Sequence, residues 1–286
     1  MGYVVIASPD VEKSARDLSS IVGVPTRSRI GAAILMSSNA KRCEVAYVPA
    51  DRPGIRSVGL EVIDAAAVDE VLRRAMGENL AILSDIPTLP GIERAIRFRT
   101  PFGPIFEVHT PSRRDFLPRP RRLPIRVRRL DHVNLRVSDP RGFHDLMTRM
   151  LGMRLSDRTE DFSRAWYRAA DGFHHTVAAG VGSGLHHYGF DAHSIVDLVG
   201  VADNLVAHGR TLLWGIGRHG PGNNVFSYYV DSMGCVVEAS FGMERLDNDP
   251  VHAPGVWDAD YEKRVLDLWG SKPPSNYAET LTPFIE

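Results

Sequence analysis

Three residues in the second half of the chain, His132, His187 and Glu238, have the types and spacing of a metal site. Glu238 follows Val236 and Val237 in a short apolar run, where a buried carboxylate is costly unless a cation receives its charge. Two neutral imidazoles and one carboxylate on one side of an ion form the facial triad of non-haem Fe(II). Such a triad leaves three adjacent coordination positions open for reactants.

The open positions of a facial triad suit one kind of chemistry. A catechol can occupy two of them with its vicinal oxygens and dioxygen the third, so that electrons can pass between the reactants through the metal. One carboxylate on a divalent ion leaves a positive charge, which a catecholate monoanion neutralises. The residue types are therefore compatible with oxygen chemistry on an aromatic diol.

Each of the three residues also has an ordinary structural explanation. A strand histidine such as His132 is often only hydrogen-bonded in a core. The pair His186 and His187 could face solvent, and Glu238 could satisfy an internal arginine. The metal hypothesis is favoured because the residues fall at corresponding points of a repeated scaffold.

That repeat has a spacing near 130 residues. The matched positions are Ser8 with Ser138, Gly23 with Gly152, Gly59 with Gly189, Gly103 with Gly234, and Glu107 with Glu238. Within each half, strands and helices alternate twice in the order strand, helix, strands. This predicts an α+β fold of two tandem domains, each made of paired βαβββ modules.

The two halves differ at the proposed ligands. The first half has Tyr3 at the position of His132 and Ser57 at the position of His187, although it keeps a glutamate. Of eleven histidines, only His109 lies before residue 131. Metal chemistry is therefore expected in the second domain alone.

The second half contains the elements that must position these side chains. Residues 130–137 are predicted as a strand with His132, Asn134 and Arg136 on one face. Further strands are expected at 166–168, 174–179, 185–192 and 211–214, and helices after Asp139 and Ser194. The last two strands, 225–230 and 235–241, form a hairpin. A four-residue turn at 231–234 would pair Ser227 with Glu238, so Tyr228 shares the Glu238 face only if the turn is odd-numbered or bulged.

The expected domain organisation has four parts. Residues 1–112 form an N-terminal, non-catalytic domain, 113–128 a linker, 129–245 the metal-binding domain, and 246–286 a tail that could cover its opening. Between residues 113 and 129 there are eight arginines and three prolines. These arginines could bind nucleic acid, but the prolines prevent a regular helix, which favours a solvated, semi-rigid linker.

The composition is that of an ordinary globular protein. The net charge of −1 gives no general attraction to nucleic acid or to an anionic membrane. Cys43 and Cys235 are the only cysteines, which suits a reducing compartment. No apolar run is long enough to span a membrane, and the first residues lack the pattern of an export signal. We expect a cytoplasmic protein without nucleic-acid or membrane partners.

From its first residue to about Phe241, the chain resembles the type I extradiol ring-cleavage dioxygenases of the vicinal oxygen chelate superfamily. The motifs that carry the resemblance are 130–134 (Leu-Asp-His-Val-Asn), 173–176 (Phe-His-His-Thr), 186–190 (His-His-Tyr-Gly-Phe) and the stretch from His219 to Glu238. The resemblance implies a two-domain fold with iron only in the second domain. It also implies that His132, His187 and Glu238 are the iron ligands.

The same resemblance assigns the residues around the metal. His175 falls on the family's acid/base histidine, His219 and Tyr228 on groups that bind or polarise substrate and oxygen, and Asn134 on a pocket asparagine of some members. Independently, ring cleavage needs a base and later an acid, and histidine does both near neutral pH. A structural role for His175 and simple packing of Tyr228 remain open alternatives.

Two departures from the family bear on the substrate. Gly222 stands where biphenyl-diol-type members tend to have an aspartate, which leaves substrate orientation open. Trp214 stands where homoprotocatechuate-type members tend to have an arginine, which argues against a carboxylate-bearing catechol. Several aromatic residues lie nearby in sequence: Phe162, Trp166, Phe173 and Phe190. We therefore predict an apolar substituted or polycyclic catechol. Its predicted contacts are Asn134, Trp166, Phe173, Phe190 and Trp214.

These observations predict an Fe(II)-dependent extradiol dioxygenase that consumes a catechol and O2. Mn(II) is an alternative metal, because the same ligands take both. We also expect a homo-oligomer. The alternative enzyme is another vicinal-oxygen-chelate activity, such as hydroquinone cleavage or a glyoxalase-like isomerisation. A metal-free small-molecule-binding protein on the same scaffold is the alternative from a different class.

Overall fold

The computed structural model describes residues 1–115, 127–246, 251–258 and 265–285. The predicted linker, 113–128, falls mostly on residues outside this part of the chain. Among the described helices, none is both long and apolar enough to cross a membrane.

The described chain forms four βαβββ modules in succession. The first two comprise β1 (Tyr3–Ser8), α1 (Val11–Val22), β2 (Thr26–Ile30), β3 (Ala33–Met36), β4 (Val45–Pro49), β5 (Gly54–Glu61), α2 (Ala65–Gly77), β6 (Ala81–Ser84), β7 (Ala95–Arg99) and β8 (Ile105–His109). The next two comprise β9 (Val127–Val137), α3 (Pro140–Arg149), β10 (Arg154–Thr159), β11 (Arg164–Arg168), β12 (Val177–Val181), β13 (Gly184–Ala192), α4 (Ile195–Ala207), β14 (Trp214–Arg218), β15 (Val225–Val230) and β16 (Val236–Phe241). The predicted α+β class with paired modules is confirmed.

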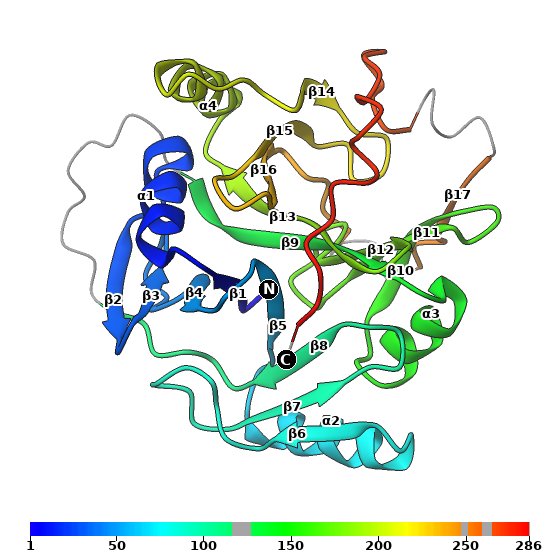
Figure 1. The fold of residues 1–286 in the computed structure, drawn as a ribbon. Coiled ribbons are helices and arrows are strands. Elements are labelled where there is room, and N and C mark those ends of the chain that lie inside the picture. The colour runs from blue at the N-terminus through cyan, green and yellow to red at the C-terminus, as the bar shows by residue number, and fades with distance from the viewer. Residues whose placement is uncertain (116–126, 247–250, 259–264, 286) are drawn as a thin grey trace.

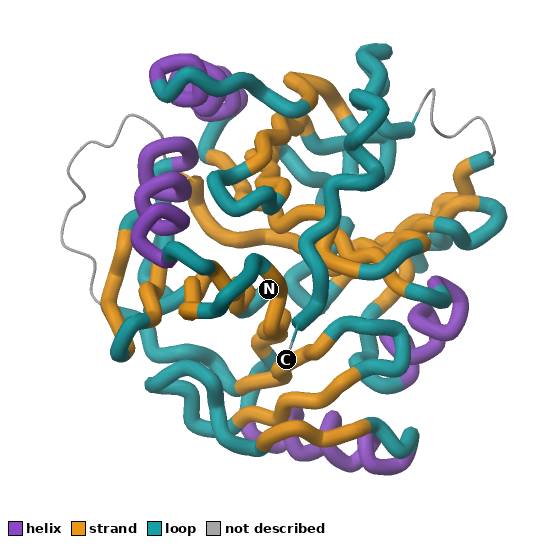
Figure 2. Tube along the Cα trace, in the orientation of Figure 1, coloured by secondary structure: helices purple, strands orange, loops and turns teal. Residues whose placement is uncertain are grey.

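Each pair of modules forms one sheet. The first has the strand order β2-β3-β4-β1-β5-β8-β7-β6 and the second β14-β15-β16-β13-β9-β12-β11-β10-β17, in which β17 (Gly255–Trp257) comes from the tail. In both sheets the leading strands of the two modules meet as an antiparallel pair, β1 with β5 and β9 with β13. The strands occupy the middle of the molecule and the helices its periphery (Figures 1 and 2).

Helix ends agree with the capping residues in the sequence. The Asp64 side chain accepts a hydrogen bond from Ala67 N at the start of α2. Ser194 and Asp197 form a reciprocal capping box at the start of α4. Such bonds satisfy amides that a helix leaves without partners in its first turn. Helix α1 ends at Gly23, whose φ of 75° is readily adopted by glycine.

Two strands begin later in the chain than predicted. The strand expected at 174–179 begins only at Val177, because His174 N donates to Glu244 O instead of joining the ladder. The strand expected at 211–214 lies at Trp214–Arg218, where it pairs with β15. The latter contains two glycines, which favour strands poorly, so propensity pointed to the wrong residues.

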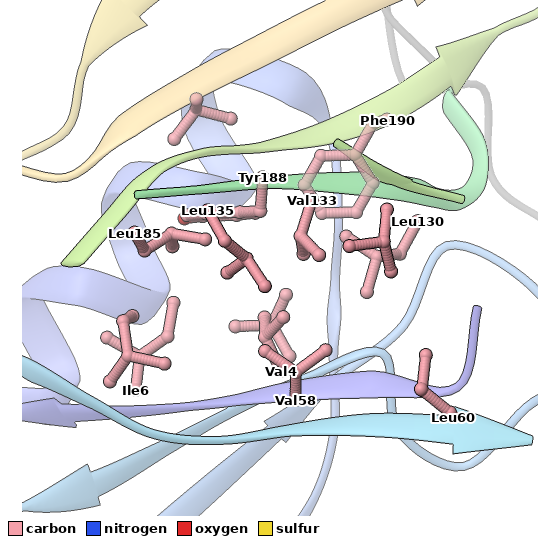
Figure 3. Close-up of a cluster of buried hydrophobic side chains, with 14 of the residues drawn as sticks. Val4, Ile6, Val58, Leu60, Leu130, Val133, Leu135, Leu185, Tyr188 and Phe190 are labelled. Carbon is pink, nitrogen blue, oxygen red and sulfur yellow. The ribbon is translucent and has the colours of Figure 1, made fainter. Parts of the chain in front are cut away.

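The largest hydrophobic cluster among the described residues joins the two sheets. Figure 3 shows Val4, Ile6, Val58 and Leu60 from β1 and β5 facing side chains from β9 and β13. These opposing side chains include Leu130, Val133, Leu135, Leu185, Tyr188 and Phe190. The outward face of the β9–β13 pair is therefore left to form a site.

The C-terminal tail runs back across the second sheet. Its strand β17 pairs in parallel with β10, and Thr282 exchanges backbone hydrogen bonds with Leu185. Ile55 N then donates to Pro283 O, so the chain ends beside β5 of the first sheet (Figure 1). The tail thus touches both halves of the molecule.

Candidate metal centre

Three neighbouring strands bring His132, His187 and Glu238 together. Strand β13 lies between β9 and β16, and Gly189 is the register partner of both His132 and Glu238. The Nε2 atoms of the two imidazoles are 3.2 Å apart, and Glu238 Oε2 lies 3.0 Å from His132 Nε2 and 3.2 Å from His187 Nε2. All three side chains are buried. The predicted grouping is therefore present.

A glycine makes this convergence possible. A Cβ added to Gly189 would lie 2.2 Å from Cε1 of His132. The His132 ring thus lies across the backbone of β13, where any side chain would displace it. The matching Gly59 of the first half similarly makes room for the ring of Tyr3.

The three converging atoms are close enough together to bind one metal ion. Two ligands about 2.1 Å from one ion and at a right angle are about 3.0 Å apart, whereas tetrahedral ligands are about 3.4 Å apart. The observed separations of 3.0 to 3.2 Å lie between the right-angle and tetrahedral values, so the three atoms can bind one ion. Each ligand histidine has its own partner at Nδ1, Asp131 Oδ1 at 2.5 Å for His132 and His186 Nδ1 at 2.7 Å for His187. Nε2 is therefore the nitrogen left for a metal.

The electrostatics also favour a cation at this point. Burial opposes ionisation of Glu238, but His132 and His187 outweigh it and hold the Glu238 pKa well below its ordinary value. Burial likewise opposes a charged His132, yet Asp131 and Glu238 raise the pKa of His132 to about 10. Burial lowers the pKa of His187 to about 4. A divalent ion would replace the proton that His132 otherwise holds.

The predicted catalytic residues surround this centre. The ring of His175 packs edge-on against His132, with 4.8 Å between centroids. His219 Nε2 lies 2.8 Å from the Tyr228 hydroxyl. Burial lowers the pKa of His175 and of His219, so both rings are neutral near pH 7 and able to accept a proton.

The β15–β16 turn settles the side of the hairpin on which Tyr228 lies. Val230 pairs with Val236, so the turn holds the five residues 231–235 rather than four. Tyr228 consequently pairs with Glu238. The sequence predicts that Tyr228 and Glu238 share a face only if the turn is odd-numbered or bulged, and the five-residue turn meets this condition.

A cavity opens beside the metal centre. Its lining includes Asn134 and Trp166, two of the predicted substrate contacts. The remaining lining residues are His132, Arg164, His175, His187, His219, Pro221, Tyr228, Glu238, Val265, Leu266 and Tyr277. Arg164 was missed, although its spacing of two from Trp166 puts both on one strand face. The three tail residues 265, 266 and 277 had no signal in the sequence.

Three other predicted substrate contacts are not among the described residues that line the cavity. Phe190 is buried between the sheets because β13 turns it away from His187. The Phe173 ring lies under the guanidinium groups of Arg129 and Arg245. Trp214 stacks behind Tyr228, with 5.8 Å between ring centroids. The structure therefore does not support Phe173, Phe190 and Trp214 as substrate contacts.

In the first half of the chain, the buried Glu107 has different partners from Glu238. The Tyr3 hydroxyl and the Thr88 hydroxyl both donate to Glu107, and Thr88 N donates at 3.0 Å. An Arg97 nitrogen lies 3.6 Å away. Hydroxyls and an arginine thus replace the histidines seen around Glu238.

Comparison with known proteins relates the second half of the chain to a known superfamily. Residues 129–239 match the model of the Glyoxalase/Bleomycin resistance protein/Dioxygenase superfamily. Metapyrocatechase 2 of Cupriavidus necator is 33% identical over 134 residues, which cover 46% of this chain and 40% of that relative. Biphenyl-2,3-diol 1,2-dioxygenase of Pseudomonas sp. (strain KKS102) is 25% identical over an alignment of 297 residues, which covers 95% of this chain and 96% of that relative.

Two solved structures share the fold. The Mn(II)-bound glyoxalase from Novosphingobium aromaticivorans has a TM-score of 0.87 at 24% identity, covering 100% of this chain and 94% of that chain. An extradiol ring-cleaving dioxygenase from B. fuscum has a TM-score of 0.88 at 20% identity, covering 99% of this chain and 82% of that chain. Residues 129–239 therefore form a domain of the superfamily named above, and over nearly its whole length the chain is similar to a biphenyl-diol dioxygenase.

Proposed function

We propose that this protein opens the ring of a catechol with dioxygen at one Fe(II) ion, or at Mn(II), held by His132, His187 and Glu238. The observation that carries the proposal is the convergence of two imidazole nitrogens and a carboxylate oxygen within 3.2 Å of one another beside a cavity. When bound, the metal would hold diol and dioxygen side by side and pass electrons between them.

The remaining residues supply proton transfer and orientation. His175, neutral because of its burial, would take a proton from a catechol hydroxyl and return it later. The Tyr228 hydroxyl and His219 form a hydrogen-bonded pair at 2.8 Å that would hold substrate oxygen. Asn134 offers an amide to the same cavity.

We further propose an apolar substituted or polycyclic catechol as substrate. Support comes from the apolar part of the cavity wall, which Trp166, Pro221, Val265 and Leu266 provide. The name of the biphenyl-diol relative agrees with this choice. The metal could also be manganese, since the ligands suit both ions and the Mn(II)-bound glyoxalase has the same fold.

The wider setting of the enzyme is also a proposal. Two buried free cysteines and a net charge of −1 support a cytoplasmic protein without nucleic-acid or membrane partners. We propose a homo-oligomer as its assembled form, and the division of the chain at 1–112, 113–128, 129–245 and 246–286 as its domain organisation.

The experiment is reconstitution with Fe(II) or Mn(II) followed by addition of catechols under air. We expect oxygen uptake and a yellow ring-opened product, faster with 2,3-dihydroxybiphenyl than with homoprotocatechuate. Bound metal without turnover of any catechol would refute the dioxygenase. Turnover of a hydroquinone, or isomerisation without oxygen uptake, would favour the alternative enzyme activities.

A further inference from the structure

Two pairs of adjacent histidines flank the metal centre in the same arrangement. In each pair the second residue, His175 or His187, faces the cavity, and the first residue, His174 or His186, lies behind it. The Nδ1 atoms are 3.0 Å apart in the first pair and 2.7 Å apart in the second. All four rings are buried. The pairs differ in the group that binds the far side of the rear histidine.

Behind His186 that group is a backbone carbonyl. His186 Nε2 lies 2.9 Å from the oxygen of Tyr277 in the C-terminal tail. A carbonyl only accepts, so the ring proton of a neutral His186 sits on Nε2 and its Nδ1 is bare. His187 must then donate from Nδ1, which directs its bare Nε2 at the metal position. The carbonyl therefore fixes the tautomer of this pair without adding a charge beside the metal position.

Behind His174 the group is a carboxylate. His174 Nε2 lies 3.3 Å from Asp157 Oδ2 on β10. The same carboxylate accepts hydrogen bonds from Trp257 Nε1 at 2.8 Å and from Gly255 N at 3.1 Å, both in the tail strand β17. By the same logic His174 Nδ1 accepts from His175, whose Nε2 is left bare toward the cavity. The carboxylate can also balance positive charge on the imidazoles.

The tail therefore contacts His186 directly and, on the other side, the Asp157 carboxylate behind His174. It also holds a third site histidine directly, because Leu266 O lies 2.6 Å from His219 Nδ1. The tail segments around 255–257, 266 and 277 thus fix the protons of three inward-facing rings. This is a more specific role than covering the cavity.

We propose that His186 with the Tyr277 carbonyl, and His174 with Asp157, are positioning groups that assign the two similar pairs to opposite tasks. The carbonyl-backed pair holds His187 in the tautomer whose Nε2 faces the metal position. The carboxylate-backed pair keeps His175 ready to take a catechol proton onto Nε2 and stabilises the charge that results. The inference rests on the proposed function for the identity of the reaction, but its metal-binding half stands without it.

Matched substitutions separate the two tasks. In His186→Asn and His174→Asn, the amide oxygen lies near the place of Nδ1 and can still accept from the inward histidine. In His186→Gln and His174→Gln, the amide reaches the place of Nε2. The hydrogen bond to Tyr277 O or Asp157 is then kept, but the inward histidine loses the group that accepts a hydrogen bond from its Nδ1. Asp157→Asn removes only the charge. Exposed His208→Phe is the control.

The first readout is the Kd for Mn(II), measured from the electron paramagnetic resonance signal of the free ion. We expect His186→Gln to weaken Mn(II) binding about 10-fold to 100-fold and His186→Asn to restore it to within about threefold. Both His174 variants and Asp157→Asn should bind Mn(II) within about threefold of wild type. Thermal unfolding of each metal-depleted variant checks that it is folded.

The second readout is kcat with saturating metal and catechol. We expect His174→Gln and Asp157→Asn to lose about 100-fold or more, and His174→Asn to lose much less. His186→Gln, once saturated with metal, should lose much less kcat than His174→Gln.

Folded His186→Gln that binds Mn(II) as tightly as wild type would overturn the proposal, as would a His174→Gln variant with unchanged kcat. Wild type that binds Mn(II) but cleaves no catechol would refute the proposed function while the Kd series still decided the metal-binding half. Wild type that binds no Mn(II) would overturn both.

Discussion

Tyr228 lies directly opposite Glu238 across the β15–β16 hairpin, and its hydroxyl is 2.8 Å from His219 Nε2. The phenol is thereby held next to a proposed metal ligand without being one itself. Burial raises its pKa well above the ordinary value, so the hydroxyl keeps its proton. Tyr228 is therefore a hydrogen-bond donor to His219 or to a bound oxygen.

Replacing this phenol should slow the reaction without affecting the metal. We predict that Tyr228→Phe lowers kcat about 10-fold to 100-fold and leaves the Mn(II) Kd unchanged. Tyr229→Phe is the matched control, since its buried ring faces the hydrophobic core between the sheets. Equal kcat values for Tyr228→Phe and wild type would show that the phenol only packs.

The close approach at Gly189 makes a sharp structural prediction. In Gly189→Ala the new Cβ collides with the His132 ring, so we expect Mn(II) affinity to fall at least about 10-fold and stability to fall by about 1 to 3 kcal/mol. Metal titration and urea unfolding measure the two effects. Gly77→Ala in α2 is the control, because no heavy atom lies within 4 Å of its new Cβ. Wild-type metal binding by Gly189→Ala would contradict the geometry.

Asp231, in the hairpin turn, should make stability depend on pH. Burial raises its pKa to about 7, above the unfolded value near 4. The stability linked to its proton is thus complete below about pH 4 and is lost as the pH rises to about 7, by about 4 kcal/mol at most. Asp231→Asn should abolish this loss, since its oxygen can still accept from Met233 N and Cys235 N. The free energy of unfolding would be measured with urea at pH 5 and pH 8 for wild type and Asp231→Asn. An equal change between the two pH values in both proteins would contradict this prediction.

Trp166 on the cavity wall should matter most for large substrates. We predict that Trp166→Leu raises KM about 10-fold for 2,3-dihydroxybiphenyl and much less for unsubstituted catechol, because less apolar surface is buried against the distal ring. Steady-state oxygen uptake gives both constants. Trp269→Leu, at a tryptophan that is 55% exposed, serves as the control. Equal changes in KM for both catechols would show that the distal ring does not pack against Trp166.

Much of this architecture followed from local patterns. The repeat near 130 residues predicted the paired modules, and cap residues such as Asp64 and Ser194 located the helix starts. The site followed because His132 and Glu238 belong to strands whose alternation fixes the side they face. The same alternation would have excluded Phe190, which lies three positions from His187 and so on the opposite face.

Other features depended on contacts that leave no local pattern. Leu266 and Tyr277 reach the site from an irregular tail, and no periodicity indicates where such a segment packs. The face of Tyr228 depended on a single residue in the hairpin turn. The outer partners of His174 and His186 lie 17 and 91 positions away, at Asp157 and Tyr277, and only the assembled fold joins them.

The most direct test of the account compares two buried glutamates that occupy equivalent strands. Metal content and oxygen uptake with 2,3-dihydroxybiphenyl would be measured for Fe(II)-reconstituted wild type, Glu238→Gln and Glu107→Gln. We predict one metal per chain and one O2 per ring for wild type and Glu107→Gln, and loss of both for Glu238→Gln. Wild-type metal content and oxygen uptake in folded Glu238→Gln would contradict the proposed centre.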